Sequence, residues 1–270
     1  MATNISNEKI EAECLHPSFP TIFEKSKTGH HSCTFADDSI FDPSEMEGLI
    51  RENPANLPEI AEIDLVRHFI GLSNRNFGVD NGFYPLGSCT MKYNPKINDV
   101  TSNLSGFTEL HPYQDVSECQ GALMLMRDLE KRLSIMYGMH SFTLQPAAGA
   151  HGEFTGLLII KKYLESKGEH DRREMLIPDS AHGTNPASAI MAGFKTVEIK
   201  SDKRGLVDIE NLKSRLSAKT AGIMMTNPNT LGLFEENVET IAKLVHDAGG
   251  QLYYDGANAN AITEIARPGD

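Results

Sequence analysis

The second half of the chain alternates between short apolar segments and longer amphipathic segments, and this alternation constrains the fold more than any other feature. The apolar segments have the length of strands and lie near 140–145, 174–178, 195–200, 221–226 and 251–255. Helical patterns lie between them, near 151–167, 185–193, 208–217 and 237–248. Each connection is long enough for a right-handed βαβ crossover, so the sequence predicts an α/β fold with a mostly parallel sheet.

The first half of the chain lacks this alternation. Residues 1 to about 60 mix prolines with charged residues, which predicts an N-terminal arm that docks on another surface. Helical spacing predicts a short helix from Glu59 to Leu72 and a longer one from Ser117 to Tyr137, whose methionine-containing stripe we expect in the core. We therefore divide the chain near residue 115. Residues 1–115 form the arm and a substrate-loop region, and residues 116–270 form the first part of a large α/β domain.

Composition excludes several classes of function. A chain of 270 residues with 40% hydrophobic residues can bury a large core. No apolar run reaches the roughly 18 residues that cross a bilayer, which indicates a soluble protein without a membrane partner. The net charge of −12 argues against binding to nucleic acid. The N-terminal residues lack the pattern of a signal peptide, so we expect a cytoplasmic protein.

The cysteines and the paired histidines do not predict a metal site. Cys14, Cys33, Cys89 and Cys119 stand far apart without a C-x-x-C pair, so we expect reduced thiols and neither a zinc site nor a disulfide framework. The adjacent His30 and His31 lack a third ligand of suitable spacing.

The loops that follow four of the five predicted strands have unusual chemistry, and in a parallel sheet all four open at the same edge. The first loop runs from Pro146 to Glu153 and consists mostly of small residues that lead into a helix. The free N–H groups of a helix start would bind a monophosphate. The loop lacks the lysine and Ser/Thr of a P-loop and the dinucleotide fingerprint, so a nucleotide triphosphate or a dinucleotide is not favoured.

The other loops carry side chains that suit a flat, nitrogen-containing ring. His182 follows the second strand and could stack on such a ring, although a structural histidine is the alternative. Asn227 follows the fourth strand and offers an amide to neutral polar atoms. Asp255 ends the fifth strand and suits a pyridinium nitrogen that must stay protonated; a helix-capping or turn aspartate is the alternative. A phosphate cradle, a stacking ring and this acid together predict pyridoxal 5'-phosphate.

A loop from Asn81 to Pro95 is rich in glycine, proline and hydroxyl groups and follows neither a strand period nor a helix period. Such a loop is costly to order unless it packs on something or holds a ligand. Ser88, Thr90 and Lys92 could meet a carboxylate there, and a purely structural loop is the alternative.

Five stretches resemble, in order, motifs of glycine dehydrogenase (decarboxylating), the pyridoxal-phosphate P-protein of the glycine cleavage system. They are Tyr84 to Lys92, Pro146 to Glu153, Ser180 to Ala187, Thr226 to Thr230 and Asp255 to Asn260. The start, Ile22 to Ser26, is similar to that of subunit 2 in organisms that divide the P-protein into two chains. The resemblance covers nearly all of the chain except roughly its first twenty residues. It implies an aminotransferase-like fold (PLP fold type I) that is incomplete at the C-terminus.

The resemblance also implies a reaction and roles for individual residues. Glycine would condense with the cofactor and lose its carboxylate as carbon dioxide, and the aminomethyl group would pass to the lipoyl group of the H-protein. Asp255 would pair with the pyridine nitrogen and His182 would stack on the ring. The phosphate would bind backbone N–H groups of Ala148, Gly149 and Ala150. Candidates for the ring oxygen are Asn227 and Asn258, and Ser88, Thr90 and Lys92 would line the path of glycine or the lipoyl arm. The implied partner is glycine dehydrogenase subunit 1, with two copies of each subunit.

One departure from the family pattern concerns the lysine that holds the cofactor as a Schiff base. The family places it in a His-Lys-Thr segment downstream of Arg-Pro-Gly-Asp, which here is Arg267 to Asp270, and no lysine lies between Asp255 and Asp270. Lys195 and Lys200 flank a strand two units earlier and are not substitutes. We expect a truncated piece of subunit 2 that cannot form the internal aldimine alone. The alternatives are another pyridoxal-phosphate enzyme, such as a desulfurase or an aminotransferase, and a catalytically inert fragment or binding module.

Overall fold

The computed structural model describes residues 19–32, 48–49, 51–53, 55–84 and 91–270. The chain forms two compact units, Met1–Gly82 and Phe83–Asp270. They meet at residues 82–83, and the domain division near residue 115 stays a prediction. None of the helices in the described ranges is long and apolar enough to span a membrane.

The first unit contains one helix in its described part, α2 (Glu62–Ser73), close to the helix predicted from the sequence. Most of its apolar side chains are exposed, whereas His68 is buried. The imidazole of His68 lies against the ring of Phe19, with 5.3 Å between the ring centroids. The aromatic contact therefore anchors the helix within this unit.

The second unit begins with short helices, α3 (Ile97–Ser102) and α4 (Ser105–Thr108), followed by α5 (Gln120–Tyr137). The predicted start of α5 at Ser117 is wrong, because the Asp115 side chain accepts a hydrogen bond from the Ser117 N–H and caps a 3-10 turn first. The expectation that the stripe of α5 lies in the core is also wrong, since none of its residues is buried against the described chain. Gly138 ends the helix as predicted, with a φ of 69° that favours glycine.

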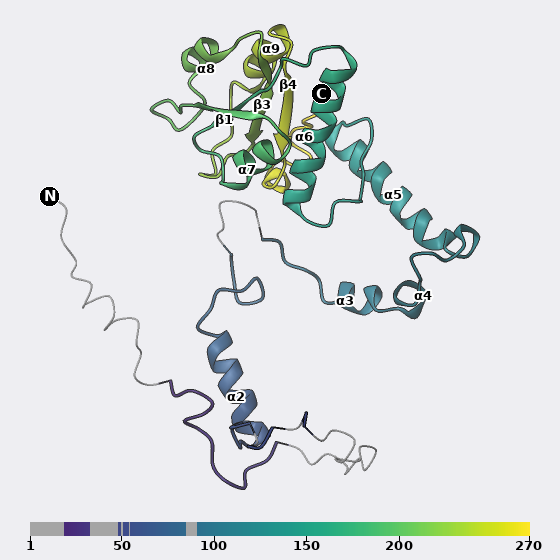
Figure 1. Ribbon diagram of the computed structural model, residues 1–270, viewed down its shortest axis with the longest axis vertical. Helices are drawn as coiled ribbons and strands as arrows, with labels where there is room; N and C mark the ends of the chain where they lie inside the picture. The colour runs from purple at the N-terminus through teal and green to yellow at the C-terminus, as the bar shows by residue number, and fades with distance from the viewer. Residues whose placement is uncertain (1–18, 33–47, 50, 54, 85–90) are drawn as a thin grey trace, which may run out of the picture. The chain divides into compact units, whose positions relative to one another are not determined.

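A parallel sheet of four strands organises the rest of the unit (Figure 1). The strands are β1 (Glu174–Pro178), β2 (Lys195–Ile199), β3 (Thr220–Thr226) and β4 (Gln251–Asp255), in the order β2-β1-β3-β4. This confirms the predicted α/β class. The strand predicted at 140–145 is wrong: this segment pairs with none of the four strands, and a strand-like pattern becomes a strand only where a partner accepts its backbone hydrogen bonds.

Helices cover both faces of the sheet. One core contains residues of α6 (Gly149–Ser166) and α7 (Thr184–Met191), and the other contains residues of α8 (Ile209–Arg215) and α9 (Val238–Asp247). Gly156 lets α6 approach β4 closely, since a Cβ there would lie 2.5 Å from Cε2 of Tyr253. This contact brings α6 beside the strand that carries Asp255.

Candidate active site

The site lies at the carboxyl edge of the sheet, where β1, β3 and β4 end. The chain leaves β1 toward β2 on one side and leaves β3 toward β4 on the other, so the loops diverge between these strands. In open parallel sheets such a switch point is where ligands bind. Thr226 and Asp255 are the last residues of β3 and β4 and are partners in the sheet register.

Asp255 is buried, and both of its carboxylate oxygens are hydrogen-bonded. Oδ2 accepts from Nδ2 of Asn185 at 3.1 Å and from Oγ1 of Thr226 at 3.3 Å, and it lies 3.0 Å from Nε2 of His182. Oδ1 accepts from the Ala257 N–H at 3.0 Å. Three side chains from separate elements therefore converge on one oxygen atom.

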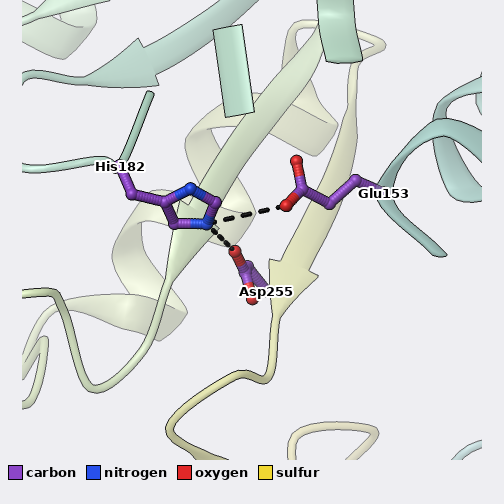
Figure 2. Close-up of side chains that lie close together, drawn as sticks. All are labelled: Glu153, His182 and Asp255. Carbon is purple, nitrogen blue, oxygen red and sulfur yellow. Dashed lines mark hydrogen bonds and ion pairs between the residues drawn. The ribbon is translucent and has the colours of Figure 1, made fainter. Parts of the chain in front are cut away.

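His182 lies between β1 and α7, and its two ring nitrogens have different roles. Nδ1 accepts a hydrogen bond from the Thr184 N–H at 3.2 Å, so in the neutral ring the proton is on Nε2. Nε2 lies 3.0 Å from Oδ2 of Asp255 and 3.6 Å from Oε1 of Glu153 (Figure 2). Figure 2 shows both carboxylates approaching the same nitrogen, Asp255 from the tip of β4 and Glu153 from α6.

Glu153 is a buried carboxylate with few partners. Its residue is 6% exposed, and Oε2 has no hydrogen-bond partner among the described residues. The 3.6 Å between Oε1 and Nε2 of His182 is longer than an ordinary hydrogen bond. Because a buried unpartnered oxygen costs free energy, this arrangement suits a site that a ligand completes.

Two tyrosines of β4 report the low polarity and negative charge of this region. Burial raises the pKa of Tyr253, and the nearby carboxylates of Asp255 and Glu153 raise it further. Burial, followed by Tyr137 and Asp255, raises the pKa of Tyr254 to about 12. The Tyr254 hydroxyl donates to the carbonyl oxygen of Asn227 at 2.6 Å. Both phenols therefore stay protonated at neutral pH.

The start of α6 offers a second type of binding group. Ala148 precedes the helix in an extended conformation, and no side chain in the described chain caps this end. The first helical N–H groups have no intrahelical acceptor, and the first turn carries no acidic residue. A Cβ at Gly149 would meet nothing within 4 Å, so the backbone is open to a ligand. The start of an 18-residue helix in this form fits a phosphate group.

The remaining predicted site residues that the structure describes form hydrogen bonds with groups other than the His182 and Asp255 side chains. Oδ1 of Asn227 accepts from the Glu235 N–H at 3.0 Å, and Nδ2 of Asn258 donates to the Pro228 carbonyl oxygen at 3.0 Å. Nζ of Lys92 donates to the carbonyl oxygen of Ala257 at 3.1 Å, which brings the loop lysine to the segment after Asp255. Ser88, Thr90 and Cys89 lie outside the described residues.

Three residues of the site were not singled out from the sequence, namely Glu153, Asn185 and Thr226. Each lies inside a stretch that the sequence analysis quoted, close to a strand end or a helix start. The available signal was their position, since polar side chains directly beside a buried strand tip face the site in a parallel sheet.

The same cluster has groups that could hold a metal ion or an organic cofactor. Ligand atoms of Glu153, His182 and Asp255 all lie within 4.8 Å of one another, a spacing that a metal could bridge. Oδ2 of Asp255 already accepts from Asn185 and Thr226, so a metal ion at this atom would compete with two donors. An imidazole, a buried carboxylate and an uncapped helix start fit an anionic aromatic cofactor better.

Solved structures with a similar fold support the architecture. The chain is similar to a glycine decarboxylase (P-protein) of the glycine cleavage system in inhibitor-bound form, with a TM-score of 0.57 and 18% identity over 78% of this chain and 46% of that one. It is also similar to a sphingosine-1-phosphate lyase from Burkholderia pseudomallei, with a TM-score of 0.54 and 15% identity over 82% of this chain and 54% of that one. These neighbours confirm the aminotransferase-like fold (PLP fold type I).

No protein-family model matches the chain. A probable glycine dehydrogenase (decarboxylating) subunit 2 from Oceanobacillus iheyensis is 54% identical over 94% of this chain and 53% of its own length. The protein of the same name from Exiguobacterium sibiricum is 57% identical over 92% of this chain and 51% of its own length. The chain therefore spans about half the length of these relatives. Over that half, it is a homologue of glycine dehydrogenase (decarboxylating) subunit 2.

Proposed function

We propose that the chain supplies the pyridoxal 5'-phosphate site of a glycine dehydrogenase (decarboxylating) in the glycine cleavage system. The observation that carries the proposal is the convergence of His182 and Asp255 at one sheet edge, 3.0 Å apart, in a chain 54–57% identical to such subunits. The uncapped start of α6 adds a phosphate-binding group beside β4. Because the chain spans about half of these relatives, the activity of the whole protein is part of the proposal.

Each residue has one role in this proposal. The N–H groups of Ala148, Gly149 and Ala150 bind the phosphate at the start of α6. Asp255 accepts the ring N–H, and the His182 imidazole packs on the ring face. When bound, the cofactor acts as an electron sink for the charge left on glycine after its carboxylate departs. The buried surroundings of Asp255 exclude water, which strengthens its ion-paired hydrogen bond.

The substrate and the partners follow from the same proposal. Lys92 extends toward the segment after Asp255, where its ammonium group can bind the carboxylate of glycine together with Ser88 and Thr90. Asn227 and Asn258 bind near the ring oxygen. The aminomethyl group passes to the lipoyl group of the H-protein. Subunit 1 completes a cytoplasmic assembly with two copies of each subunit.

Equilibrium binding of pyridoxal phosphate to the chain tests the site. Asp255→Asn replaces the acceptor of the ring N–H by a neutral amide, so we expect affinity to fall by about tenfold or more, equivalent to about 1.4 kcal/mol. Circular dichroism of the variant checks that the fold is kept. Equal affinity of the parent and a folded Asp255→Asn variant would refute the proposed role. Glycine-dependent exchange of carbon dioxide, measured with lipoylated H-protein and subunit 1, separates this enzyme from a desulfurase or an aminotransferase.

A second candidate function is a binding module that holds the cofactor without turnover. The observation that favours it is that no lysine is among the hydrogen-bond and ion-pair partners of His182 and Asp255 in the described residues. Borohydride reduction followed by peptide mass mapping decides between the two. A reduced cofactor on a lysine of this chain would contradict the binding-module alternative, and reversible binding without an adduct would support it.

A further inference from the structure

The site contains two carboxylates that compete for one N–H group. Nδ1 of His182 accepts from the Thr184 N–H, which leaves a single proton on Nε2 of the neutral ring. Nε2 lies 3.0 Å from Asp255 and 3.6 Å from Glu153, so the N–H is donated to Asp255. Glu153 is left as a buried carboxylate whose second oxygen has no partner in the described chain.

The oxygen that accepts from His182 has no room for another donor. Oδ2 of Asp255 is already contacted by Asn185, Thr226 and His182. A carboxylate oxygen has two lone pairs, so three donors already crowd this atom, and an N–H of the cofactor ring that comes to Oδ2 must take the place of one of them.

His182 is the donor that is free to leave. Asn185 is fully buried within α7, and Thr226 is buried at the end of β3. His182 is on the loop between β1 and α7 and has the most exposed side chain of the three donors. A tilt of the imidazole can take Nε2 off Asp255 while Nδ1 keeps the Thr184 N–H at the start of α7, and the Nε2–H then needs a new acceptor.

We propose that Glu153 is a positioning residue that accepts the Nε2–H of His182 when the ring nitrogen of pyridoxal phosphate takes the place of this N–H on Asp255. This inference rests on the proposed function. No proton changes its atom: the Nε2–H turns from one carboxylate to the other, and the cofactor keeps its own N–H. The exchange gives Glu153 the partner that it lacks and fixes the imidazole beside the ring.

Cofactor affinity measured on the parent chain and three variants tests the exchange. Glu153→Met keeps the length of the side chain and removes the acceptor, and we expect it to weaken binding by about tenfold. Glu153→Gln keeps an acceptor oxygen and should stay within about threefold of the parent. Glu165→Gln removes the charge of a half-buried glutamate farther along the same helix and should leave the affinity unchanged. Without cofactor, Glu153→Met should be at least as resistant to urea as the parent, because the unpartnered carboxylate is gone.

Nitrogen-15 NMR of the histidine side chains gives a readout that a purely structural role would not change. In the parent, the Nε2–H signal of His182 should persist after pyridoxal phosphate is added, because Glu153 shields it from exchange with water. In Glu153→Met the signal should be lost on addition. If the parent and Glu153→Met bind pyridoxal phosphate with equal affinity, or if the Nε2–H signal persists in both, the proposed exchange alone is overturned. Failure of the parent to bind pyridoxal phosphate would instead overturn the proposed function.

Discussion

Replacing Asn185 by alanine should destabilise the second unit, because it removes a fully buried amide that holds the site together. Nδ2 of Asn185 donates to Oδ2 of Asp255 at 3.1 Å, while the residue itself is 0% exposed. A hydrogen bond to a carboxylate contributes about 1.5–3 kcal/mol, and the contact with Thr226 Oγ1 at 3.5 Å is too long to add much. With a small cavity left behind, we expect a loss of about 2–3 kcal/mol in the free energy of unfolding.

Urea denaturation followed by circular dichroism measures this loss. Ser188→Ala is the matched control, since it removes a buried hydroxyl from the same helix without touching Asp255, and its cost should be under about 1 kcal/mol. Asn185→Asp provides a second comparison. Two carboxylates about 4 Å apart repel by about 4 kcal/mol at an effective dielectric constant of 20. Asn185→Asp should therefore have a lower free energy of unfolding than Asn185→Ala at neutral pH, and the difference should shrink in acid. Identical urea midpoints for Asn185→Ala and Ser188→Ala would refute the reasoning.

Two further predictions concern β4 and the helix that packs on it. Gly156→Ala should lower the free energy of unfolding by about 1–3 kcal/mol, because its Cβ would lie 2.5 Å from Tyr253. The control is Gly152→Ala in the same helix, whose Cβ meets nothing within 4 Å and which should raise the free energy of unfolding by up to about 1 kcal/mol. Equal urea midpoints for the two variants would contradict this prediction. The pKa of Tyr254 is raised from 10.0 to about 12, so its contribution to stability is complete below pH 10 and is lost as the pH rises toward 12. Between pH 9 and pH 12, the urea midpoint should therefore fall less steeply for Tyr254→Phe than for the parent. Parallel curves for the two proteins would contradict the predicted role of Tyr254.

The sheet could be predicted because parallel strands covered on both faces are apolar throughout. Residues 175–178 and the whole of β3 are buried, and their continuous apolar runs stand out in the sequence. The segment 140–145 has only an alternation of polar residues with Phe142 and Leu144, and it forms no strand. Pairing depends on which segments meet in space, and a local pattern contains no information about that.

The candidate site was only partly predictable for a related reason. His182 and Asp255 could each be recognised because they follow apolar strands, where a parallel sheet presents side chains to a ligand. Their hydrogen bond spans 73 positions in sequence and depends on β3 lying between β1, which precedes His182, and β4, which carries Asp255. Glu153 and Asn185 could not be predicted from the sequence, because a polar residue inside a helix gives the same pattern whether it faces water or a buried carboxylate.

The pairing of Thr226 with Asp255 in the sheet register has a consequence for how the chain tolerates changes in length. One residue inserted within β4 would advance the acid by about 3.3 Å and turn it toward the opposite face of the sheet. The same insertion in the turn from Asp202 to Leu206 would leave β3, β4 and their pairing as they are. The backbone hydrogen bonds between β3 and β4 thus set the position of the acid. Insertions and deletions can accumulate in the outer turns, whereas the strands must keep a fixed length.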